Sequence, residues 1–154
     1  MAGQFVIGFI VSMINIMIHA LATIAAIGVA RAVGLRYTSS PRLHLMIVMV
    51  ATVVVLKFAH GLEVIAWALS YALVGAAPEG SDLLYFAFVN YTTLGYGDVT
   101  PVEAWRLLGP MAAMTGILMF GWSTAVLFEV LMKTLAHLGS IAAPGTPFSS
   151  ADRS

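Results

Sequence analysis

Long apolar runs alternate with short polar breaks along this chain. Apolar residues dominate 5–33 and 43–73, and a third run covers 102–136. A helix rises about 1.5 Å per residue, so each run exceeds the roughly 20 residues that cross a hydrocarbon core. The pattern therefore predicts three membrane-spanning helices, over 1–34, 43–75 and 102–136.

A shorter apolar segment, 81–92, lies between the second and third runs. It is too short to span a bilayer as a helix, and glycines follow it directly. Ser81 is the expected N-cap, with Asp82 favourable in the first turn. A half-length helix is tolerated at membrane depth where protein or a water-filled cavity surrounds it. We therefore predict a re-entrant helix over 81–92.

Composition supports a membrane protein. The 154 residues are 60% apolar and only 9% charged, with a mean hydropathy of +0.96, whereas about 25% charged residues is usual for a soluble domain. The net charge is zero, which gives no case for nucleic acid or an acidic partner. The lack of cysteine excludes disulfides and thiolate metal sites. We expect an all-α membrane protein in contact with the lipid bilayer, with no enzymatic activity and no cofactor.

Basic residues predict the orientation. Arg31, Arg36 and Arg42 cluster around the connection between the first two runs. Because short cytoplasmic loops carry an excess of Lys and Arg, residues 35–42 are predicted to be cytoplasmic. The N-terminus is then outside the cell membrane and the C-terminus inside. The tail, 139–154, is rich in Gly, Pro, Ser and Ala and is predicted to be disordered.

The most specific motif follows the short segment: Thr92-Thr93-Leu94-Gly95-Tyr96-Gly97-Asp98. Two glycines flank one tyrosine, so the backbone can adopt torsions closed to other residues. At average residue usage the pattern Thr-x-Gly-Tyr-Gly-Asp within this segment arises by chance about once in a million positions. The segment resembles the selectivity filter of potassium channels, in which carbonyl oxygens replace the hydration shell of the ion. The alternative is a surface Gly-Tyr-Gly turn.

The resemblance extends over a whole pore module, 43–138. It implies an outer helix at 43–75, a pore helix at 81–92, a filter at 93–98 and an inner helix at 102–136. Four such modules surround one axis in that family, so one module per chain implies a homotetramer. Potassium would be the permeant ion and the only bound metal. The first helix, 1–34, is additional to the module, and the resemblance does not explain it.

The resemblance also assigns the ion-binding atoms. Thr93 would offer its hydroxyl and carbonyl oxygens, Leu94, Gly95 and Tyr96 their carbonyls, and Gly97 would shape the outer mouth. Asp98 and Thr92 would support the filter from behind.

Two positions depart from the family pattern. Val89 stands where some members have a Glu that pairs with the filter Asp, and Phe86 stands where an aromatic donor is common. Tyr85 is therefore the expected hydrogen-bond donor to Asp98. The missing buttress puts the stability of the filter in doubt.

Residues on the predicted inner helix recur at i+3 and i+4 spacing and are candidates to line a cavity or gate: Ile117, Phe120, Thr124 and Phe128. Gly116 aligns with the hinge glycine of the family. The alternative for this glycine is close helix packing, and the alternative for the apolar stripe is contact with lipid or protein.

Polar residues inside the first two helices form a second candidate site, because such groups are costly at membrane depth: Asn15, His19, Lys57, His60 and Glu63. Counted from the outer helix ends, Glu63 should face Asn15 and His60 should face His19. The site is interpreted either as a proton-sensitive or voltage-sensitive element or as a structural clasp between helices. A metal site on His19, His60 and Glu63 is a further alternative, although no HExxH-like spacing supports it.

The leading hypothesis is thus a potassium-selective channel subunit. A less selective monovalent cation channel is the nearest alternative, favoured if the missing buttress loosens the filter. A non-conducting regulatory subunit, part of a transporter, and a metal-dependent membrane enzyme are the others.

Overall fold

The structure is a computed structural model that describes residues 2–34 and 40–142. The elements in chain order are α1 (Ala2–Gly34), α2 (Pro41–Val74), α3 (Leu83–Tyr91), a 3₁₀ turn (Glu103–Trp105) and α4 (Leu108–Ala142). The described residues contain no strand. The all-α prediction is confirmed.

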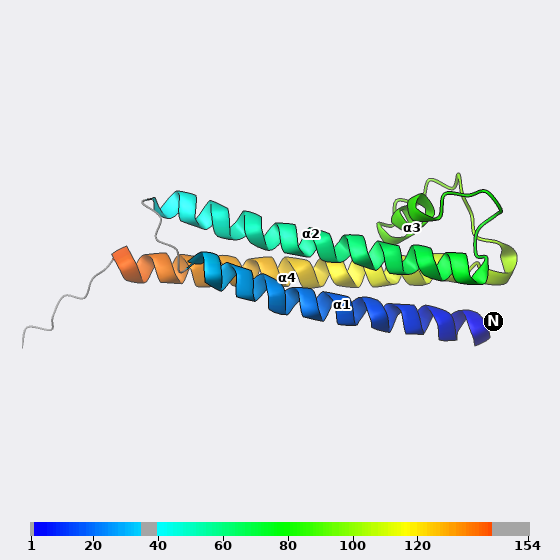
Figure 1. Cartoon of the computed structure of the whole chain (residues 1–154), viewed down its shortest axis with the longest axis horizontal. Helices are drawn as coiled ribbons and strands as arrows, with labels where there is room; N and C mark the ends of the chain where they lie inside the picture. The colour runs from blue at the N-terminus through cyan, green and yellow to red at the C-terminus, as the bar shows by residue number, and fades with distance from the viewer. Residues whose placement is uncertain (1, 35–39, 143–154) are drawn as a thin grey trace, which may run out of the picture.

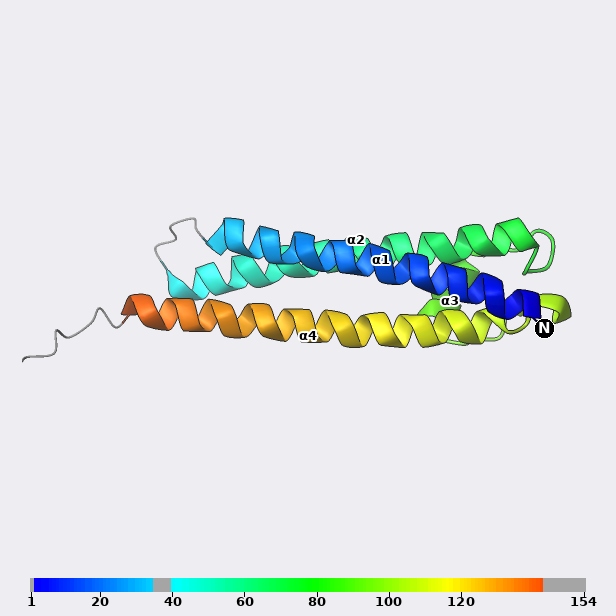
Figure 2. The ribbon, with the colours of Figure 1, turned by 90° about the horizontal axis from the view of Figure 1, so that it is seen from below.

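Three long helices lie alongside one another (Figures 1 and 2). They contain 33, 34 and 35 residues, so each is about 50 Å long. α1 contacts both α2 and α4, and α2 also contacts α4. All three are long and apolar enough to cross a membrane, and large apolar side chains such as Phe9, Leu21 and Leu73 are exposed on their outer surface. The chain is therefore a multi-pass membrane protein.

The short helix α3 lies at the same end of the bundle as the N-terminus (Figure 1). It packs against α2 and α4. Its N-cap is Asp82, whose Oδ1 accepts from the backbone N–H groups of Leu84 and Tyr85 at 3.0 Å each. The prediction that Ser81 is the cap was wrong by one residue, because the Asp82 carboxylate satisfies two free N–H groups of the first turn at once.

The inner helix begins later than predicted. Residues after Pro101 form a 3₁₀ turn instead of the first turns of a helix, and α4 starts at Leu108. Pro110 explains the difference. Pro110 is the third residue of α4, where a backbone N–H has no acceptor within the helix, so the missing N–H of proline costs nothing there. In a helix that began at 102, Pro110 would lie in the interior and would break a helical hydrogen bond.

The other boundaries differ less. α2 begins at Pro41, a favoured first residue because of its fixed φ. α4 continues to Ala142, so 139–142 are helical and not part of a disordered tail. The rest of the predicted tail and residues 35–39 of the predicted loop lie outside the described residues.

The interior consists of two apolar clusters. One lies at the α3 end and includes Trp67, Tyr71, Phe86 and Tyr91. The other lies towards the opposite end and joins the three long helices through Ala26, Val48, Leu56, Val126 and Val130. Trp122 packs against both clusters.

Candidate functional site

The Gly-Tyr-Gly loop, residues 92–98, is anchored on the last turn of α3. The Thr92 hydroxyl donates to the carbonyl of Phe88 at 2.7 Å. The next two backbone N–H groups, of Thr93 and Leu94, donate to the carbonyls of Asn90 and Val89 at 3.0 Å each. Thr92 therefore fixes the point at which the chain leaves the helix.

The sign of φ alternates along the loop. Thr93, Gly95 and Gly97 have φ values of 60°, 61° and 79°, whereas Leu94 and Tyr96 between them do not have positive φ. Alternating right- and left-handed residues turn successive N–H groups to one side and so turn successive carbonyls to the other. Only glycine adopts positive φ freely, so the two glycines are required here. Thr93 does so at a cost of about 1–2 kcal/mol, a strain expected at a functional site.

The carbonyls of this loop are not used inside the chain. Every residue from 92 to 98 is exposed, including Tyr96 at 68%. Within the described part of the chain, no hydrogen bond is donated to the carbonyls of 93–97. A row of unpaired carbonyls on a membrane protein is available to bind a cation.

One hydrogen bond supports the loop from behind. The Tyr85 hydroxyl donates to Asp98 Oδ2 at 2.6 Å, as predicted, and the backbone N–H of Val99 donates to Oδ1 at 3.1 Å. The bond from Tyr85 lowers the pKa of Asp98 and raises the pKa of Tyr85. Asp98 is therefore held as a carboxylate next to the loop.

The inner helix touches the base of the loop through a glycine. A Cβ on Gly116 would overlap the backbone carbonyl of Tyr91, the last residue of α3. This contact gives Gly116 a packing role. Gly121 differs, because a Cβ there would meet nothing within 4 Å.

The candidate cavity residues lie on one exposed side of α4. Ile117 and Phe128 are 61% and 62% exposed, and Thr124 is also exposed. Phe120 is 38% exposed, and its ring lies 4.8 Å from that of His60 and 5.5 Å from that of Tyr91. Apart from Phe120, the stripe is largely uncovered in a single chain, which fits either a cavity wall or a packing surface.

A buried polar cluster joins all four helices around Glu63, which is 0% exposed. His19 Nδ1 lies 2.8 Å from Oε1, and His60 Nδ1 lies 3.0 Å from Oε2. The Tyr91 hydroxyl also donates to Oε2. Ser123 Oγ completes the cluster, 2.9 Å from His60 Nε2 and 3.3 Å from His19 Nε2. Glu63 thus connects α1, α2, α3 and α4.

Hydrogen-bond roles in this cluster can be counted. Glu63 accepts at both oxygens, so His19 Nδ1, whose partner is Oε1, donates to it. His60 Nδ1 lies 3.0 Å from both Glu63 Oε2 and the Tyr91 hydroxyl, so it either donates to the carboxylate or accepts from Tyr91. Both Nε2 atoms then face Ser123, which has one proton to give. The Ser123 contacts are satisfied when one ring donates from Nε2 to Ser123 and Ser123 donates to the Nε2 of the other ring. Every side chain of the cluster therefore has a hydrogen-bond partner within it.

Two predicted members are placed differently. Glu63 faces His19 and not Asn15, whose Nδ2 donates to the carbonyl of Val11 in its own helix at 2.8 Å. The observed partner lies four residues, about one helical turn, beyond the expected one, because the depth argument assumed that the two apolar runs end level. Lys57 is exposed on the outer face of α2 and lies apart from the cluster. The rings of His19 and His60 lie close together, with centroids 5.3 Å apart, but no hydrogen bond joins the two rings among the described contacts.

His19, His60 and Glu63 offer ligand atoms that all lie within 4.8 Å of one another, close enough to hold a metal ion by distance. Those atoms already bond to each other, and Tyr91 and Ser123 complete the set. A metal would have to replace these bonds. The arrangement therefore fits a hydrogen-bonded clasp better than a metal centre.

Sequence reasoning missed Tyr91 and Ser123, and also two contacts of α1. Gln4 Oε1 accepts from the backbone N–H of Leu107 at 3.0 Å, and Ser12 Oγ lies 2.9 Å from Thr115 Oγ1. Each of these side chains is a polar group in an otherwise apolar helix or next to the loop. Polar side chains are rare at such positions, and their rarity is the signal that could have identified them.

Comparison with known proteins agrees with this geometry. The family model described as "Ion channel" matches residues 44–133, more than half of the chain, from the first turn of α2 to the far part of α4. α1 lies outside the match. No curated protein and no solved structure matches the chain significantly. Because the match covers more than half of the chain, the chain belongs to the ion-channel family.

Proposed function

We propose that this channel protein is one subunit of a potassium-selective channel in which four copies surround the conduction pathway. The observation that carries the proposal is the Gly-Tyr-Gly loop. Its sequence resembles that of a potassium filter, its φ values alternate in sign, its residues are exposed, and the carbonyls of 93–97 accept no hydrogen bond from the described residues. One chain supplies one such row of carbonyls, so a ring of oxygens requires further copies.

The chemistry of the loop suits fast cation transit. Dehydrating a cation is costly, so several oxygens must replace its water molecules together. Carbonyls do this with less retention than carboxylates. In the proposed filter Thr93 contributes its hydroxyl and carbonyl, Leu94, Gly95 and Tyr96 contribute carbonyls, and Gly97 shapes the mouth. In the proposed pore, the carboxyl end of α3 directs its partial negative charge towards the ion pathway below the filter.

The orientation is part of the same proposal. The arginines around the connection between α1 and α2 favour a cytoplasmic position for that end of the bundle. The loop and the N-terminus, which share the opposite end (Figure 1), then face the exterior. The exposed stripe of α4 lines the pathway below the filter: Ile117, Phe120, Thr124 and Phe128.

Reconstitution in liposomes with a potassium flux assay tests the proposal. Wild type should conduct, and Gly95→Ala should abolish flux because a Cβ at φ 61° strains the row of carbonyls. Gly75→Ala is the matched control. Gly75 has φ 62° and equally open surroundings but lies at the end of α2, away from the loop. Absence of flux in wild type, or equal flux in both variants, would refute the proposal.

A less selective cation channel is the second candidate, and one observation favours it. Phe86 and Val89 are buried apolar side chains behind the loop, so Tyr85 is the side chain that donates to Asp98 among the described residues. Reversal potentials in mixed potassium and sodium separate the two candidates. We expect a potassium-selective potential. A potential near zero in equal and opposite gradients would favour the second candidate.

A further inference from the structure

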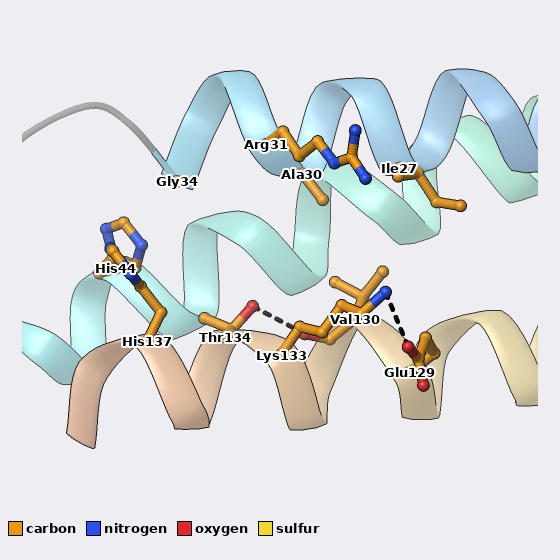
Figure 3. A pocket seen from close by; sticks show the side chains of 10 residues that line it. All are labelled: Ile27, Ala30, Arg31, Gly34, His44, Glu129, Val130, Lys133, Thr134 and His137. Atoms are coloured by element: carbon orange, nitrogen blue, oxygen red, sulfur yellow. Dashed lines mark hydrogen bonds and ion pairs between the residues drawn. The ribbon is translucent and has the colours of Figure 1, made fainter. Parts of the chain in front are cut away.

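A cavity of about 340 Å³ lies at the end of the bundle opposite the Gly-Tyr-Gly loop. Figure 3 shows that its walls come from the last turns of α1, the first turn of α2 and the part of α4 beyond Glu129. Ile27, Ala30 and Val130 give it apolar surface. Polar side chains gather on the same walls, so the cavity is amphipathic.

One lining residue has an unsatisfied buried atom. His44 is only 6% exposed, and its Nε2 is buried without a hydrogen-bond partner. A buried polar atom of this kind is uncommon in native structures and requires a specific explanation. Because the side chain lines the cavity, an oxygen of a bound ligand is the partner that the fold leaves open for it.

The charge on the walls favours an anion. Arg31, in the last turn of α1, lines the cavity and has no ion pair with any described residue. Its guanidinium can bind phosphate through two parallel hydrogen bonds. Lys133 lies on the facing side and is balanced by Glu129, whose Oε1 is 2.8 Å from its Nζ. Arg31 therefore leaves the cavity with positive charge.

The position of the cavity identifies the source of the anion. α2 has 34 residues and is therefore about 50 Å long, whereas the hydrocarbon core is about 30 Å thick. The first turn of α2, with His44, thus lies at the level of the lipid headgroups. Basic pockets between membrane helices recognise anionic headgroups. We propose that this cavity binds an anionic phospholipid, with its phosphate on Arg31 and His44 and its acyl chain along Ile27, Ala30 and Val130.

The site does not depend on which ion the channel conducts. Native mass spectrometry of the detergent-purified protein, titrated with phosphatidylglycerol and with phosphatidylcholine of the same acyl chains, measures binding directly. Wild type should bind phosphatidylglycerol more tightly than phosphatidylcholine. Arg31→Gln should weaken that binding roughly ten- to hundredfold, the range for one charged hydrogen bond. His44→Phe should weaken it by a smaller factor, because it removes one hydrogen-bonding nitrogen and keeps an aromatic ring.

Arg106→Gln is the matched control. It removes the same charge from an exposed arginine at the opposite end of the bundle and should leave binding unchanged. Equal retention of both lipids would overturn the proposal, since an apolar groove alone would then explain binding. Displacement of the lipid by inorganic phosphate at the same concentration as the lipid would also overturn the proposal. So would an equal loss of lipid binding in Arg31→Gln and Arg106→Gln. Arg31 is exposed, so its variant tests the site even if His44→Phe fails to fold.

Discussion

The Glu63→Gln variant tests the polar cluster most directly. Glu63 is 0% exposed, and three groups converge on its carboxylate: His19 Nδ1, His60 Nδ1 and the Tyr91 hydroxyl. A glutamine keeps the shape but replaces one accepting oxygen by an N–H₂ group, so at least one buried donor loses its acceptor. Leaving a buried polar group without its partner costs about 1–3 kcal/mol. A loss near 3 kcal/mol lowers the unfolding midpoint by roughly 6–12 °C in a chain of this size.

Thermal unfolding of the purified protein in mild detergent measures this loss. Glu129→Gln is the control, because Glu129 is a 58% exposed carboxylate whose pair with Lys133 is worth about 0–1 kcal/mol. We expect a large fall in midpoint for Glu63→Gln and almost none for Glu129→Gln. Equal midpoints would show that the cluster contributes nothing to stability and would refute the hydrogen-bond count.

The same variant separates the two interpretations of the cluster. A structural clasp predicts a lower yield of assembled protein and an unchanged pH dependence of the current through the protein that remains. A proton-sensitive element predicts a changed pH dependence with normal yield. Single-channel recording across pH, with assembly measured by size-exclusion chromatography, distinguishes them. We expect the result for a clasp, because every side chain of the cluster already has a hydrogen-bond partner within it.

Two further variants test the surroundings of the loop. Tyr85→Phe removes the hydrogen bond that lowers the pKa of Asp98, so the pKa of Asp98 should rise towards its ordinary value. The Asp98 carboxylate stabilises the fold above its unfolded pKa, and this stabilisation is lost on acidification, so the variant should lose it at a higher external pH than wild type. Unchanged conductance and inactivation over an acid titration would contradict this. Gly116→Ala should cost about 1–3 kcal/mol by overlap with the Tyr91 carbonyl, whereas Gly121→Ala, which meets nothing within 4 Å, should be tolerated; equal thermal midpoints of the two variants would exclude the close contact.

Features set by local rules were predictable from the sequence. Apolar length alone predicts the three long helices, and the short length of 81–92 predicts the helix that ends at the loop. The bond from Tyr85 to Asp98 follows from their positions, because Phe86 and Val89 beside them cannot donate. Each inference needs only chain length, side-chain chemistry and neighbouring positions.

Features that depend on how helices are offset were not predictable. The predicted partner of Glu63 was Asn15, yet the offset of α1 by one turn brings His19 to it. Apolar runs carry little information about such offsets, because sliding one apolar helix along another by one turn still places apolar side chains against apolar side chains. The start of α4 is a different case. Pro110 carried the signal, and the error came from giving Pro101 more weight.

The contacts of Tyr91 explain why α1 belongs to the same folding unit as the family-matched region. Tyr91 is 0% exposed and immediately precedes the loop. Its hydroxyl bonds to Glu63, and its carbonyl lies against Gly116 of α4. His19 of α1 supplies another donor to the same carboxylate. Because the position of Tyr91 sets where the loop begins, α1, which lies outside the matched residues, takes part in holding the loop through His19 and Glu63.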